Sequence, residues 1–207
     1  MNWGSLFDRG ESADVDRAAV TGALERRRSG IDDRRDGDEP NTESGDPSAS
    51  TPPDPSPSRV VADADVLAAD LLCGGDAREA LDAIRRHSWM TLVASEPLVA
   101  DAREVIAELT EETLADEWAE LVTERSERVE HPAGDHPALA SAYRGGAMHV
   151  LSFDPGLTSA AAGVAVRGRI PASIREPHAF AAVFDAERLY PTVVGGEYPG
   201  PDRDPRA

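Results

Sequence analysis

Hydrophobic and polar positions divide the chain into two parts at about residue 59. Beyond that point, short runs of apolar residues alternate with stretches in which apolar residues recur every three or four positions. The runs predict buried strands of a parallel sheet, and the periodic stretches predict amphipathic helices. Strands that alternate with helices predict an α/β fold, a three-layer sandwich around a central and mostly parallel sheet.

The predicted elements follow from these patterns and from the residues that interrupt them. Strands are predicted at 59–62, 90–94, 148–153 and 163–166. Helices are predicted at 76–87, 95–109, 113–129, 135–143 and 177–184, with a short one near 156–161. Ser95 has the side chain of a helix N-cap, and Gly145 and Gly146 favour a helix end. The residues after Tyr190 are rich in Gly and Pro, so we expect an irregular tail over 191–207.

Residues 1–58 are predicted to be a leader in front of a single domain at 59–190. From 37 to 58 the residues are almost wholly small or polar, which predicts a disordered acidic linker because little apolar surface can be buried. Residues 13–28 have apolar positions at roughly helical spacing and end in three arginines, which favour the helix dipole. Such a short and weakly apolar helix docks on the domain, binds a partner or stays disordered.

The charge of the chain leaves two interpretations open. Net charge is -18 over 207 residues, and all 21 basic residues are Arg, without a single Lys. An acidic, lysine-free chain resembles proteins of halophilic archaea, in which the charge is an adaptation to salt and salt screens repulsion from a polyanion. Without that adaptation, the charge argues against a nucleic-acid partner.

Other features of the composition narrow the class of protein. Hydrophobic residues make up 40% and aromatic residues 5%, so the core must consist mainly of Ala, Val and Leu. Cys73 is the only cysteine, which excludes a disulfide within the chain. No apolar stretch has the length of a membrane span and no signal peptide is recognisable, so we expect a cytoplasmic protein.

Acidic residues stand at the positions where a parallel sheet binds ligands. Asp63 and Asp154 each follow an apolar run that predicts a strand. In open parallel sheets, ligands bind just beyond the carboxyl ends of the strands. These two carboxylates, joined by Asp101 and Asp135 from helices, predict a site for Mg²⁺ or Mn²⁺, because such ions prefer oxygen ligands and often act in pairs on phosphodiesters.

Four sequence blocks occur in a familiar order. They are VVADADVL at 60–67, SEPLVADAREVI at 95–106, DHPALASA at 135–142 and GGAMHVLSFDPGL at 145–157. With this series, residues 59–190 resemble a PIN domain, the α/β fold of a superfamily of nucleases. The whole chain, including its acidic leader, is also similar to a halophilic-archaeal subgroup of PIN-like proteins.

The resemblance implies an active site and a metal cofactor. Its catalytic residues would be Asp63, Asp101, Asp135 and Asp154, with the first, third and fourth as ligands of Mg²⁺ or Mn²⁺. Three further residues would orient the ligands or water, namely Asp65, Ser152 and Glu104. Such nucleases hydrolyse phosphodiester bonds, usually of RNA.

One position departs from the family pattern. The family has Glu where this chain has Asp101, and the shorter side chain reaches about 1.5 Å less far. Glu104 is the nearby substitute, although three residues along a helix turn it about 60° away. This substitution leaves open whether the site is active.

Each candidate residue also has a simpler interpretation. Asp63 and Asp154 suit helix caps or turns, Asp135 suits an N-cap, and Asp101 suits a solvated helix face. The spacing of His131, Asp135, His136 and His149 fits no standard zinc motif, so these histidines are expected at helix starts or on the surface. Four arginines suit either an RNA groove or solvated helix faces: Arg78, Arg85, Arg86 and Arg103.

Three functions remain as hypotheses. The first is a metal-dependent PIN-type ribonuclease, and its alternative is a catalytically degraded PIN-fold binding or scaffold protein. A DNA nuclease of the flap-endonuclease type is less favoured, because the chain is short and lacks further acids at suitable spacing. The partners expected from the resemblance are RNA, an antitoxin-like regulator and a second copy in a homodimer.

Overall fold

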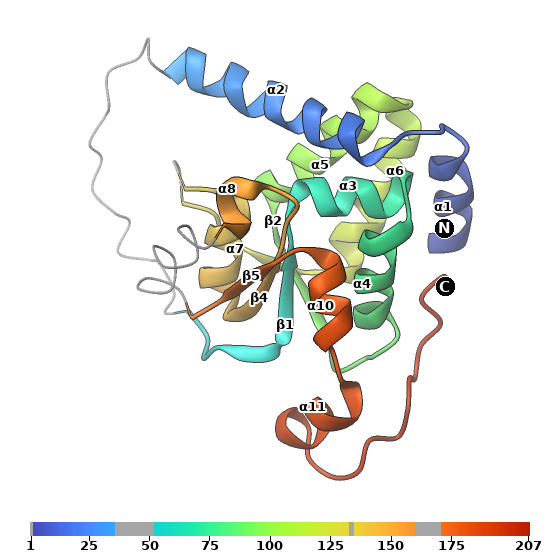
Figure 1. Ribbon diagram of the computed structural model, residues 1–207, viewed down its shortest axis with the longest axis vertical. Coiled ribbons are helices and arrows are strands. Elements are labelled where there is room, and N and C mark those ends of the chain that lie inside the picture. Colours follow the sequence, from blue (N-terminus) through green and yellow to red (C-terminus); the bar gives the residue numbers. More distant parts are fainter. Residues whose placement is uncertain (1, 36–51, 133–134, 160–170) are drawn as a thin grey trace.

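A five-stranded parallel sheet forms the centre of the molecule in the computed structural model, which describes residues 2–35, 52–132, 135–159 and 171–207, with side chains in the first stretch up to residue 29. The strands are β1 (Ser56–Ala62), β2 (Thr91–Ser95), β3 (Glu127–Val129), β4 (Ala147–Leu151) and β5 (Ser173–Arg175). All four neighbouring pairs are parallel, and the order is β3-β2-β1-β4-β5. The predicted α/β fold with a parallel sheet is confirmed (Figure 1).

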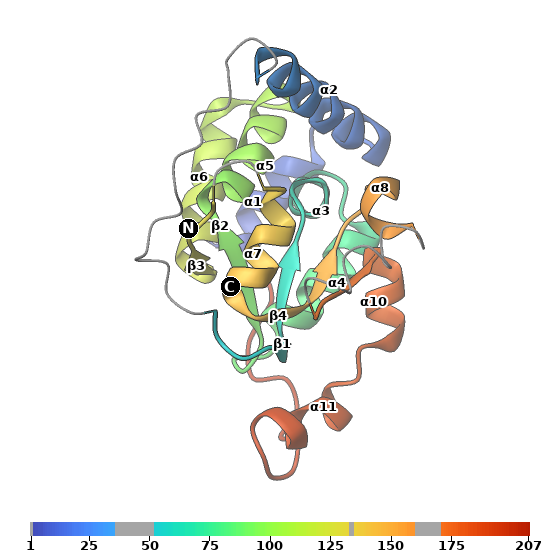
Figure 2. The same cartoon turned by 90° about the vertical axis from the view of Figure 1, so that its left-hand side faces the viewer.

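Helices flank the sheet. They are α1 (Trp3–Glu11), α2 (Arg17–Arg35), α3 (Ala64–Leu72), α4 (Gly75–Arg85), α5 (Glu96–Leu109), α6 (Glu112–Arg125), α7 (Pro137–Gly145), α8 (Pro155–Thr158), α10 (Pro177–Val183) and α11 (Ala186–Val193). Helices α3, α4 and α10 pack together on one face, and α7 covers the other face (Figure 2). Right-handed crossovers of parallel strands place α3 and α4 on the face opposite α7, because the chain runs from β1 to β3 in one direction and then returns past β1 to β4.

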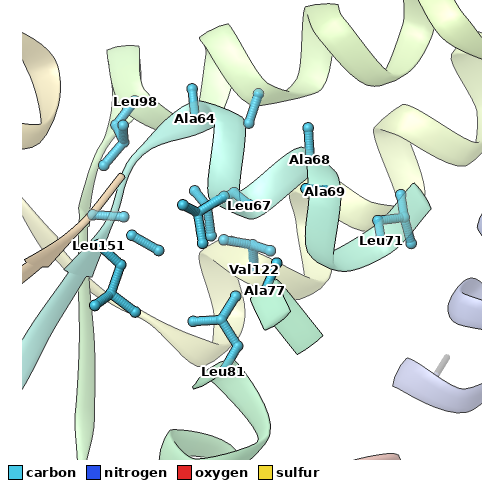
Figure 3. Close-up of a cluster of buried hydrophobic side chains, with 14 of the residues drawn as sticks. Ala64, Leu67, Ala68, Ala69, Leu71, Ala77, Leu81, Leu98, Val122 and Leu151 are labelled. Atoms are coloured by element: carbon cyan, nitrogen blue, oxygen red, sulfur yellow. The ribbon is translucent and has the colours of Figure 1, made fainter. Parts of the chain in front are cut away.

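The core is built from small aliphatic residues, as the composition predicts. Side chains of α3, α4 and the central strands meet between the layers, among them Leu67, Leu81 and Leu151 (Figure 3). Val60 and Val61 on β1 are fully buried, because β1 lies in the middle of the sheet and has helices on both faces.

The leader contains more structure than the sequence pattern predicts. Two helices replace the single one expected at 13–28, and both contribute buried residues, Trp3, Leu6 and Phe7 from α1 and Val20, Ala23 and Leu24 from α2. Of the three alternatives for this segment, the structure has the docked one, with α2 lying against α3 and α5. Most of the predicted linker at 37–58 lies outside the described residues.

A buried ion-pair cluster holds α1 in place. The carboxylate of Asp70 in α3 accepts hydrogen bonds from two arginines of α4. They come from Arg78 Nε at 2.9 Å and from two nitrogens of Arg85 at 2.8 Å. The Phe7 ring lies 3.2 Å from the Arg78 guanidinium carbon, and the Trp3 ring 4.9 Å from that of Arg85. These two arginines therefore form part of the interior, and the hypothesis that they line an RNA groove is wrong.

Several boundaries differ from prediction for physical reasons. The helix expected at 113–129 ends at Arg125, and its last residues form β3, a short edge strand without an apolar run to identify it. Strand β5 and helix α11 were not predicted, and the chain is irregular from residue 194 on. The strand predicted at 163–166 lies outside the described residues. None of the helices described here combines the length and the apolarity that a membrane crossing requires.

Gly10 is expected to be essential for the docking of α1. A Cβ atom on Gly10 would overlap the carbonyl oxygen of Leu71 in α3, so Gly10→Ala should force the two helices apart and cost about 1–3 kcal/mol of unfolding free energy. Gly22→Ala is the matched control, because its Cβ would meet only Arg26 Nη1 at 3.4 Å, and it should stabilise α2 by about 0.5–1 kcal/mol. Denaturant unfolding measures both, and equal effects would contradict the close approach.

His149 is expected to make stability depend on pH. Its ring packs on Phe180 with 5.5 Å between centroids, and burial, with Arg175 nearby, lowers its pKa below the ordinary 6.5. The unfolded chain therefore binds a proton more readily than the folded one, so stability should decrease as pH falls through 6.5. His149→Gln should reduce this slope in unfolding measurements, with His136 supplying the remainder. An unchanged slope would exclude His149 as a source.

Candidate functional site

The candidate site lies where the strand order reverses. The chain places β2 on one side of β1 and β4 on the other, and ligands of open α/β sheets bind at such a switch point. Strands β1 and β4 end in register, with Ala62 opposite Leu151, and the Asp63 amide donates to the Leu151 carbonyl at 2.8 Å. The residues that follow the two strands are therefore neighbours, as their positions after apolar runs predict.

Asp63 is the buried centre of this cluster. Its side chain is fully buried. Asp63 is the N-cap of α3, and its backbone is extended. Oδ1 accepts from the Ala64 amide at 2.8 Å and from Arg28 at 2.9 Å, and Oδ2 accepts from the Ser152 hydroxyl at 3.0 Å. Each carboxylate oxygen has at least one donor, so its orientation is fixed.

Asp154 approaches the same point from β4. Its amide donates to Ser152 Oγ at 3.0 Å, which links it through that hydroxyl to the Asp63 carboxylate. Its own carboxylate accepts from the Gly156 amide at 2.7 Å and caps α8, while 37% of the side chain remains exposed. Asp63 and Asp154 therefore do cap helices, as their simpler interpretation predicts. The same positions also bring the two carboxylates together.

Asp65 joins the two halves of the site. In the first turn of α3, its Oδ1 accepts from the Val66 amide at 2.6 Å and its Oδ2 from the Phe153 amide at 3.0 Å. Burial and the adjacent Asp63 charge raise the pKa of Asp65 to about 8. Two carboxylates this close in a buried place share one negative charge unless a cation is near.

A cation from the leader is present in the site. The guanidinium group of Arg28 on α2 donates to Asp63 Oδ1 and has its Nη1 3.6 Å from Asp154 Oδ2. Its side chain is 23% exposed, so the ion pair is largely removed from solvent. Arg28 therefore occupies the position between the two strand-end carboxylates.

Asp101 and Glu104 form a second, adjoining group on α5. Arg27 Nε donates to Asp101 Oδ1 at 3.1 Å, and the same guanidinium contacts Glu104. The Asp101 side chain is only 13% exposed, so it does not lie on a solvated helix face. The two acids are three positions apart on α5, and both pair with Arg27.

His136 belongs to the site although the sequence reasoning assigned it no role there. Its ring caps α7, with Nδ1 accepting from the Ala138 amide at 3.3 Å, and Nε2 is buried with no partner among the described residues. Burial lowers its pKa, and the charges of Asp63, Arg28, Asp154 and Asp101 all act on it. The signal available in the sequence was His136-Pro137 at a helix start, which is typical of an N-cap and Pro at N1.

Asp135 does not join the cluster. It is exposed, and among the described residues no ion pair or hydrogen bond connects its side chain to the other three predicted acids. His136, and not Asp135, is the N-cap of α7, which corrects that alternative. Within the described part of the chain, no three His, Cys, Asp or Glu side chains are grouped closely enough to hold a metal ion.

The residues present nevertheless suit a hard divalent cation in part. Two of the three predicted ligands, Asp63 and Asp154, already face one positive group from two sides, and Arg28 stands in for that charge. Carboxylate oxygens on adjacent strand ends are ligands that Mg²⁺ and Mn²⁺ prefer. Because Asp135 does not join them in the described structure, the remaining ligands would have to come from Asp101 or water.

Comparison with known proteins places the chain in a family without a known activity. A family model matches residues 54–206, which cover β1 and everything after it and leave out α1 and α2. No curated protein and no solved structure gives a significant match to the chain. The chain belongs to the family of unknown function DUF7384.

Proposed function

We propose that the protein is a metal-dependent nuclease of the PIN type, which hydrolyses RNA phosphodiester bonds in the cytoplasm. The observation that carries the proposal is the meeting of Asp63 and Asp154 around a single positive charge, at the switch point of a parallel sheet. The sequence blocks that resemble a PIN domain supply these same residues. Fold and sequence thus support one location for the chemistry.

The side chains divide the work of holding the site. Asp63 and Asp154 would bind the cation, and the Ser152 hydroxyl would keep the Asp63 carboxylate turned toward it, as its 3.0 Å hydrogen bond does now. Asp65 would hold the loop after β4 through the Phe153 amide. Bound Mg²⁺ or Mn²⁺ supplies a Lewis acid that activates water and stabilises the leaving oxygen of a phosphodiester.

A degraded PIN-fold binding protein is the second candidate, and two observations favour it. Asp101 stands where the PIN-domain pattern has Glu, and it is paired with Arg27. Asp135 makes no contact with the other acids in the described structure. A site with only two ligands from the protein would bind a divalent cation weakly. Metal binding and cleavage therefore separate the two candidates.

Cleavage of RNA should depend on both strand-end acids. With a panel of labelled single-stranded and structured RNAs in molar KCl and Mn²⁺, the unmodified protein should cleave at least one RNA. Asp63→Asn and Asp154→Asn should each lose more than about 100-fold, because even residues that only support a metal ligand cost 10–100-fold. Asp116→Asn removes an exposed partner of Arg103 outside the cluster and should keep full activity.

Thermal unfolding with Mn²⁺ provides the second measurement. An intact site should gain about 2.7 kcal/mol of stability at 100 times its dissociation constant, and the two Asn variants should not. If the protein shows neither cleavage nor stabilisation by Mn²⁺, the nuclease is excluded. That result would leave the degraded binding protein, whose site should gain no stability from Mn²⁺.

A further inference from the structure

The geometry points to a function for the leader: α2 is an internal plug whose arginines compete with a divalent cation for the carboxylates at the ends of β1 and β4. This inference rests on the proposed function, because it assigns a regulator to the same site. Opening of the plug would be required before a metal ion could bind Asp63 and Asp154 together.

The first support is the place of Arg28. Its two terminal nitrogens lie 2.9 Å from Asp63 Oδ1 and 3.6 Å from Asp154 Oδ2, so one group contacts both strand ends. A divalent cation held by Asp63 and Asp154 would use the negative charge that the guanidinium group now neutralises. The two modes of neutralisation exclude each other.

The second support is a row of matching charges along α5. Three acids of α5 lie on one face, because their spacing of three and four residues returns to the same side of a helix. Asp101 and Glu104 pair with Arg27, and Glu108 pairs with Arg26 at 2.7 Å. Successive arginines of α2 therefore bind successive acids, from the exposed end of α5 to the buried strand ends.

The third support is that α2 is attached by charges as well as by apolar contact. Val20, Ala23 and Leu24 are buried apolar residues of α2 among residues 17–29, the part of the helix whose side chains are described. Ion pairs of Arg26, Arg27 and Arg28 add to this apolar contact. Attachment through charges is sensitive to competing cations, as a regulatory contact must be.

The position of the plug in the sequence agrees with a separable part. The family model begins at residue 54, after α2, so the matched region includes Asp63 and Asp154 and leaves out the arginines of α2. Arg26, Arg27 and Arg28 are consecutive.

Binding of Mn²⁺ to full-length variants tests the plug directly. Arg28→Ala should bind Mn²⁺ roughly tenfold more tightly than the unmodified protein, a factor within the usual range for coupled sites. Arg26→Ala is the matched control, since it removes the same charge from the same helix but only from the exposed pair with Glu108, and its affinity should stay within about twofold. Free Mn²⁺ is counted by electron paramagnetic resonance in molar KCl.

Two additions keep the test independent of folding and of cleavage. Arg28→Lys retains the positive charge and should fall between the unmodified protein and Arg28→Ala, which guards against a variant that does not fold. Hydrogen exchange of the α2 amides should become faster in the unmodified protein when Mn²⁺ is added, because the helix is displaced.

The outcomes separate the plug from the nuclease. Equal Mn²⁺ affinity in Arg28→Ala and Arg26→Ala, no Mn²⁺ binding by Arg28→Ala, or unchanged exchange of α2 would each overturn the plug, even if RNA is cleaved. Tighter binding by Arg28→Ala with displacement of α2 would establish it, even if none of the proteins cleaves RNA and the proposed nuclease fails.

Discussion

A buried carboxylate needs a positive partner, and the arrangement of this protein around Asp63 follows from that requirement. The side chain has no exposed surface, and an unpaired charge in such a place costs several kcal/mol. The amide at the start of α3, the Ser152 hydroxyl and Arg28 share the compensation. These groups come from α3, from the residue after β4 and from α2, so the neutralisation of one carboxylate brings together segments that are far apart in the sequence.

The same principle appears twice, with different results. Asp70 is also buried, but its two arginines come from α4 in the same domain and are covered by the Phe7 and Trp3 rings. That cluster is closed and serves as a foundation for α1. Asp63 has its arginine from a helix outside the matched family region, and the neighbouring Asp154 stays partly exposed. One cluster is therefore closed, and the other has one carboxylate that solvent reaches.

The sequence predicts most of the fold because its strongest patterns coincide with the central strands. The apolar runs before Asp63 and Asp154 identify β1 and β4, and these two acids were placed at strand ends for that reason. An edge strand such as β3 cannot be predicted in this way, because its sequence Glu-Arg-Val contains no apolar run. Helix α1 escaped as well, because its burial depends on contacts of Phe7 with Arg78 and of Trp3 with Arg85, which lie 71 and 82 residues further along the chain.

The site was predicted only as far as local patterns reach. Strand ends gave Asp63 and Asp154, and the helix start gave Asp135, which the fold leaves at the surface. Arg28 lies 35 residues before its buried partner, and a run of arginines in an acidic leader carries no sign of where it binds. The place of His136 in the site could not be predicted, because its position before Pro137 is already explained by a helix N-cap. Only the fold shows that the charged residues of the site surround it.

The attachment of α1 gives α2 the character of a tethered ligand. Through Gly10 and the aromatic rings, α1 stays fixed to α3 and α4, and Asp14 turns the chain in a left-handed conformation before α2 begins. A helix held at its start returns to its binding surface at an effective concentration set by the tether, which for short connections reaches the millimolar range. Occupancy of the acids by the arginines is therefore independent of how much protein is present, unlike inhibition by a separate chain.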